Sequence, residues 1–225
     1  AYATDDWLFR LLTMAQMVGV VIFALGLPDV FKSMDEGNIL DNRVVVFGYM
    51  IMRLPLVALW LRAARHDAAR RPTALTYVKT LLAAQALWTV IMIVDLPIAA
   101  TFAAMSVPFA IELLGPYLAE RKGGTPWHPH HIAERYGLLT IIALGEGVIG
   151  TVASVSALVE AAGWNLDAIL VAGAGIGLTF ALWWIYFWPP HHYAIGNLRQ
   201  SLAYGYGHYF IFAAAGAFSA GIEVE

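Results

Sequence analysis

The 225-residue sequence is 60% hydrophobic and 13% charged, about half of the roughly 25% charged residues that are typical of soluble domains. This composition excludes a soluble globular domain, because the chain lacks the polar side chains that such a surface needs. The net charge of −3 gives no indication of a nucleic-acid partner, and the lack of cysteine excludes disulfides and cysteine-type zinc sites. The sequence therefore predicts an all-α, polytopic bundle of transmembrane helices in a lipid bilayer.

About seven stretches are apolar enough and long enough to cross a bilayer as helices. In chain order they are 7–27, 44–61, 74–94, 98–119, 131–159, 165–188 and 198–222. The first stretch stops at Pro28, ahead of an acidic loop. The sequence contains no internal repeat, so we predict a single transmembrane domain over residues 1–225. We also expect this chain to be the internal part of a longer protein, incomplete at both ends.

The charges of the loops predict the orientation, because short cytoplasmic loops are enriched in Lys and Arg. Loops 62–73, 120–130 and 189–199 are basic. Loops 28–43, 95–97 and 160–164 contain only two basic residues, Lys32 and Arg43. We therefore place the three basic loops in the cytoplasm.

Three ionisable residues lie deep in the predicted spans, where an unpaired charge costs several kcal/mol. They are Arg53 in the second span, Glu112 in the fourth and Glu146 in the fifth. We expect each to face protein, with Arg53 paired to one of the two carboxylates. A structural ion pair and a path for protons, ions or a small solute are the open interpretations. Pro55 and Pro108 lie nearby, and mid-helix prolines free carbonyls that can bind a cation.

The fifth span carries several of its charged residues on one face. Arg135 and Glu146 are 11 residues apart, which leaves them only about 20° apart around a helix. His131 lies about 60° from Glu146 on the same count. As a path, Glu146 would accept the proton or cation, and Arg135 would be its electrostatic partner or an anion gate. Glu112 and Arg53 would be secondary residues of the path wall. His131 and Glu134 would then form the cytoplasmic mouth.

Five histidines flank two of the spans on the predicted cytoplasmic side: His128, His130, His131, His191 and His192. Neutral imidazoles suit zinc, nickel or copper, so a metal site is one interpretation. A pH-sensitive mouth is the other, because histidine titrates near physiological pH. The sequence establishes no contact between the two groups and implies no other cofactor.

Motifs of soluble enzymes are missing: the sequence contains no Gly-x-Ser-x-Gly elbow, no His-Glu-x-x-His and no Walker loop. We therefore expect a transporter or channel rather than an enzyme. A membrane-embedded enzyme or lipid-binding protein with a His/Glu site stays open, as does a non-catalytic component of a membrane assembly. The oligomeric state is also open, a homo-oligomer included.

The stretch His131-Ile-Ala-Glu134-Arg135-Tyr136-Gly137-Leu138, followed by Leu144-Gly145-Glu146, resembles the signature of the bacterial low temperature requirement A (LtrA) family. Further matches are Trp183-Trp184-x-Tyr186-Phe187 and Gly207-His208-Tyr209. The resemblance implies a multi-pass protein of the bacterial inner membrane with no established activity or substrate. It supports His131, Glu134, Arg135 and Glu146 as the site. Gly147 departs from the family pattern, since serine is expected there.

Overall fold

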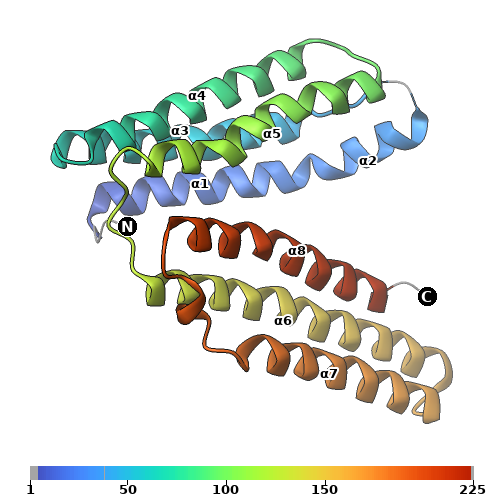
Figure 1. The fold of residues 1–225 in the computed structure, drawn as a ribbon. Helices are drawn as coiled ribbons and strands as arrows, with labels where there is room; N and C mark the ends of the chain where they lie inside the picture. The colour runs from blue at the N-terminus through green and yellow to red at the C-terminus, as the bar shows by residue number, and fades with distance from the viewer. Residues whose placement is uncertain (1–4, 38, 224–225) are drawn as a thin grey trace. The chain divides into compact units, whose positions relative to one another are not determined.

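The computed structural model describes residues 5–37 and 39–223. All regular elements within these two ranges are helical, which confirms the predicted all-α fold (Figure 1). The helices are α1 (Trp7–Leu25), α2 (Leu27–Glu36), α3 (Arg43–His66), α4 (Arg71–Ile93), α5 (Ile98–Glu120), α6 (Pro129–Ala162), α7 (Leu166–Phe187), the short 3₁₀ helix η1 (His191–Ala194) and α8 (Leu198–Glu223).

Six helical segments of the described chain are long and apolar enough to cross a membrane, by length and composition. They are Trp7–Glu36, Arg43–His66, Arg71–Ile93, Ile98–Glu120, Pro129–Ala162 and Leu166–Phe187. The seventh predicted span is also a helix, α8, but it falls outside this group. Its first half carries Arg199, Gln200 and His208 among several tyrosines, which lowers its hydropathy.

The loop predicted after the first span differs from the structure. Pro28 lies in the first turn of α2 rather than in a loop. A proline is tolerated there because the first amide groups of a helix have no partner within the helix. Helix α2 ends at Gly37, whose φ of 78° is in the left-handed region that glycine adopts readily. The acidic residues Asp29, Asp35 and Glu36 therefore lie on a helix.

The described chain divides into two compact units, Ala1–Pro126 and Trp127–Glu225. The single domain that the sequence suggests stays a prediction. In the first unit α3 packs against α1 and α4, and α4 packs against α5. Its core holds Val46, Ala84 and Trp88.

Helices α1 and α3 cross at two glycines. A Cβ added to Gly48 would lie 2.4 Å from the backbone nitrogen of Phe23, and one added to Gly19 would lie 2.7 Å from that of Met52. Such distances require glycine at both positions, because any larger residue would push the backbones apart. Small residues let helices approach in this way inside a membrane.

In the second unit α6 packs against both α7 and α8. Small residues let α6 and α7 approach closely, since a Cβ on Gly175 would lie 2.3 Å from Thr151 Oγ1. The hydroxyl of Ser154 on α6 donates to the carbonyl of Ile222 on α8 at 2.7 Å. Close packing thus joins all three long helices of this unit.

Candidate functional site

Three helices of the first unit surround one carboxylate, that of Glu112 on α5. Its Oε2 accepts a hydrogen bond from the Tyr49 hydroxyl at 2.6 Å and lies 3.0 Å from Nη2 of Arg53. Its Oε1 accepts from the indole nitrogen of Trp88 at 3.2 Å. The structure thus pairs Arg53 with Glu112, one of the two partners that the sequence suggested. We call Tyr49, Arg53, Trp88 and Glu112 the Glu112 cluster.

Local helix geometry builds this cluster. Tyr49 and Arg53 are four residues apart on α3, so they lie on the same face and the guanidinium sits 4.5 Å from the centre of the Tyr49 ring. The guanidinium also donates to the Tyr49 hydroxyl. The Arg53 and Glu112 side chains are only 22% and 17% exposed. Every donor points at a charge that would be costly in lipid without them.

Proline changes the backbone at this position of α5. Residue 116 follows Glu112 by four and is a proline inside the helix. A proline has no amide hydrogen, so it cannot donate the usual helical bond to the carbonyl of Glu112. Pro108 has the same effect on the carbonyl of Ala104, about two turns earlier. One backbone carbonyl without its usual helical donor therefore belongs to Glu112 itself.

A buried amide lies near the cluster without a partner. Gln85 on α4 is 7% exposed, and neither its Oε1 nor its Nε2 has a hydrogen-bond partner in the described protein. It precedes Trp88 by three residues and so shares its helix face. Buried polar groups in proteins are nearly always satisfied, by protein or by ordered water. The interior beside Trp88 therefore has the polarity to hold a water or a small polar solute.

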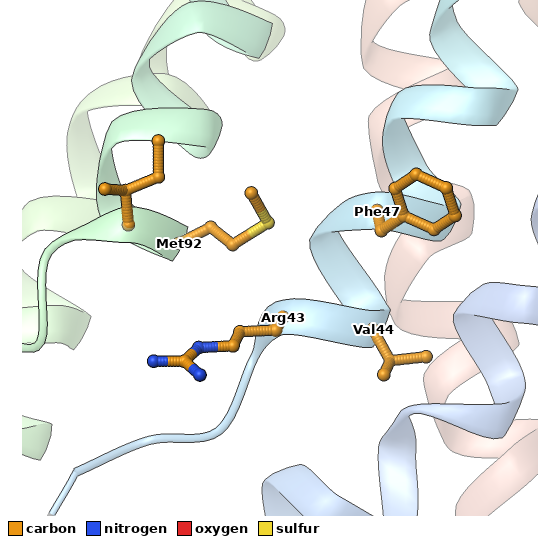
Figure 2. Close-up of a pocket in the computed structure, with 5 residues that line it drawn as sticks. Arg43, Val44, Phe47 and Met92 are labelled. Carbon is orange, nitrogen blue, oxygen red and sulfur yellow. The ribbon is translucent and has the colours of Figure 1, made fainter.

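An open groove lies close to the cluster, between the first turns of α3 and the last turn of α4. It has a volume of about 510 Å³ and is lined by Arg43, Val44, Phe47, Met92 and Ile93. Figure 2 shows Arg43 and Met92 extending into the space between the two helices. Met92 also packs against the core that contains Trp88. The wall of the groove is thus one side chain away from a donor to Glu112.

The residues nominated on the fifth span lie elsewhere, on α6 of the second unit. Arg135 and Glu146 are both exposed within that unit, and neither has an ion pair or hydrogen bond to the described residues. His131 Nδ1 lies 3.7 Å from Glu134 Oε2, with both side chains exposed. The expected contact of Glu146 with polar protein groups is therefore not found inside its own unit. Its part in a path stays a prediction.

The structure brings part of the histidine set together. The rings of His130 and His192 stack at 4.1 Å, and His128 lies 5.4 and 5.5 Å from His130 and His131. His191 makes no ring contact with these four histidines. Its Nε2 donates to the carbonyl of Tyr186 at 2.6 Å. Among the described residues, no group of three or more His, Asp or Glu side chains is arranged to hold a metal ion. The metal site stays a prediction from the sequence.

A second buried polar cluster joins α7 and α8. His208 is 3% exposed, and its Nδ1 donates to the carbonyl of Tyr204 at 2.7 Å. In the neutral imidazole, Nε2 then accepts from the Tyr186 hydroxyl at 2.9 Å. The Tyr136 ring on α6 packs against His208 at 4.6 Å. This arrangement fixes one tautomer of a buried histidine.

The entire chain, residues 1–225, matches the family described as bacterial low temperature requirement A protein (LtrA). The chain belongs to the LtrA family. Neither the curated proteins nor the solved structures contain a significant match. Family membership and the apolar helices together make this LtrA chain a multi-pass membrane protein.

The motif that carries the LtrA resemblance and the best-connected charges of this LtrA chain lie in different units. His131, Glu134, Arg135 and Glu146 are on α6, whereas Glu112 and Arg53 are on α5 and α3. Sequence reasoning found Glu112 and Arg53 but missed Tyr49, Trp88 and Gln85. The usable signals were a glutamine inside an apolar span, Gln85, and a tryptophan inside the same span rather than at its end, Trp88.

Proposed function

We propose that this LtrA protein moves protons or small cations across the membrane, with Glu112 as the group that binds them. The observation that carries the proposal is a carboxylate inside a span that receives Tyr49, Trp88 and Arg53 from two other helices. Intramembrane carboxylates with such partners mark ion and proton pathways in membrane proteins.

The chemistry follows from the charge balance of the pair. An arginine side chain carries a positive charge in proteins, so Arg53 and an ionised Glu112 together are neutral. A proton or cation that binds Glu112 competes with Arg53 for the same carboxylate oxygens. When the ion displaces Arg53 from the carboxylate, the guanidinium is left as an unpaired positive charge in an apolar region. This cost destabilises the ion-bound state. Binding and release would therefore alternate rather than trap the ion.

Two further observations support a route to Glu112. The unpartnered amide of Gln85 can hold water on the inner side of Trp88. The groove is lined by Met92, which packs against the core that contains Trp88, and by Arg43, at the end of α3 that we predict to lie outside the cytoplasm (Figure 2). On this proposal Glu112 replaces Glu146 as the central carboxylate of the path. A variant at Glu146 then serves for comparison with the variant at Glu112.

The test is proton flux into liposomes that carry a pH-sensitive dye and an imposed pH gradient. Glu112→Gln keeps the size of the side chain but cannot ionise, and we expect it to lower flux at least tenfold. Glu36→Gln, an exposed carboxylate on α2, is the control and should retain full flux. Glu146→Gln should lower flux only if the path uses α6. Unchanged flux in a folded Glu112→Gln protein contradicts the proposal.

A purely structural role is the second candidate, and the complete pairing of Glu112 favours it. The exchanged pair Arg53→Glu with Glu112→Arg separates the two. A structural pair should recover both thermal stability and flux when exchanged, because the attraction is restored. A conducting carboxylate should recover stability alone, since its donors and its helix have changed.

A further inference from the structure

A second groove, separate from the Glu112 cluster, lies between the first turns of α1 and the last turns of α3. Its volume is about 510 Å³. One part of its wall is apolar and includes Leu8, Leu12 and Leu61. The other part is polar and includes Asp6 together with Arg62, Arg65 and His66, which lie at the end of α3. The groove thus has an apolar side and a mainly basic side.

The cations differ in how they are neutralised. Arg62 forms a two-point pair with Asp6, with Nη1 donating to Oδ1 at 2.8 Å and Nη2 donating to Oδ2. His66 Nδ1 donates to the carbonyl of Arg62 at 2.8 Å, which fixes its ring. Arg65 is exposed and has no ion pair or hydrogen bond to any described residue. One positive charge at the groove therefore lacks a partner from the described protein.

The position of the groove matches a membrane interface. The end of α3 leads into loop 62–73, which the charge bias places on the cytoplasmic side. The last carbonyls of a helix carry partial negative charge, so Arg65 and His66 are held favourably there. Basic pockets between helices on this side suit anionic lipid headgroups.

We propose that this groove binds an anionic phospholipid of the cytoplasmic leaflet. The headgroup phosphate pairs with Arg65 beside His66, and an acyl chain lies along Leu8, Leu12 and Leu61. The basic residues and the apolar wall together suit a ligand that has both an anionic group and an apolar chain. The proposal is independent of ion transport, because the groove shares no residue with the Glu112 cluster.

The test measures how the purified full chain binds phosphatidylglycerol that is titrated into phosphatidylcholine nanodiscs, by retention of the lipid in native mass spectrometry. Arg65→Gln should weaken binding about fivefold, the effect of one basic residue at a membrane surface. Arg71→Gln is the matched control, since it removes the same charge from an exposed residue that does not line the groove. Equal weakening by both variants would mean diffuse attraction and would overturn the proposal.

A second pair of variants tests the apolar wall. Leu12→Trp fills the groove without a change in charge and should also weaken binding, whereas Met14→Trp on the exposed face of α1 should not. Inorganic phosphate and glycerol phosphate form the last arm. If they bind as tightly as the lipid, the groove holds a soluble anion and the lipid assignment is wrong.

Discussion

Glu112 and Glu146 are both carboxylates inside apolar helices, but their surroundings differ. Glu112 has three donors on two neighbouring helices, whereas Glu146 is exposed within its unit among side chains such as Ile142 and Ile149. A buried and paired charge can be kept ionised inside a membrane protein, while an unpaired one depends on a cover from outside its own unit. The difference decides which carboxylate is the better candidate for ion binding.

The carboxylate of Asp6 makes a prediction about pH. Hydrogen bonds from Arg62, and from the amide of Phe9, hold the pKa of Asp6 well below its usual range. A lowered pKa means that the ionised form stabilises the fold above the unfolded-state pKa of about 4, and that this stability is lost as pH falls through the folded-state pKa.

We therefore expect Asp6→Asn to lower the melting temperature at pH 7, and the difference from the original protein to shrink below about pH 4. Asparagine still caps a helix, so the variant isolates the loss of charge. Thermal unfolding in detergent across this pH range is the measurement. Asp35→Asn, an exposed residue of α2, is the control. A difference that does not depend on pH would show that the ion pair contributes nothing.

Sequence reasoning reached the charged half of the Glu112 cluster and not its neutral half. Arg53 and Glu112 are conspicuous because charge is rare in an apolar span. Tyr49, Trp88 and Gln85 are ordinary residues of membrane helices, and only the packing of α3, α4 and α5 gives them a role. The register between helices is a tertiary property, which a single sequence does not encode in any local pattern.

At the scale of helices, the second unit depends on small residues where α6 meets α7. Gly175 contacts Thr151, whose hydroxyl donates to the carbonyl of Gly147 at 2.6 Å. Gly173 lies two residues away on the same helix, and a Cβ there would meet nothing within 4 Å. The two glycines thus offer a matched comparison within one helix.

We predict that Gly175→Ala destabilises the protein by about 1–3 kcal/mol, because the new methyl group overlaps Thr151. Gly173→Ala should be neutral or slightly stabilising, since alanine favours helix more than glycine does. Thermal unfolding of both variants is the measurement. Adding Thr151→Ala to Gly175→Ala should recover part of the loss. Equal effects at the two glycines would contradict the close packing of α6 and α7.

For the whole molecule, the pattern of spans was predictable because hydropathy and loop charge are local properties of the sequence. The predicted boundaries agree with the helices to within about three residues, except that α3 continues to His66. Helix α2 was missed because its polar residues resemble a loop. The polar first half of α8 separates it from the six apolar segments.

The orientation can be tested because the sequence contains no cysteine. We propose that the protein lies in the bacterial inner membrane with loops 62–73, 120–130 and 189–199 in the cytoplasm. In intact spheroplasts, a membrane-impermeant maleimide should label Trp164→Cys and should not label Ala69→Cys. Inside-out vesicles should reverse the result. Labelling of both sites from one side would overturn this topology.

The close crossing of α1 and α3 restricts where the first unit can change shape. Because the backbones touch at Gly19 and Gly48, these two helices cannot slide past each other without a clash, so they should move as a rigid body. Helix α5 is different, since Pro108 and Pro116 lie on either side of Glu112 and prolines are where helices bend. A hinge in α5 would carry Glu112 away from Arg53 while α1 and α3 stay fixed.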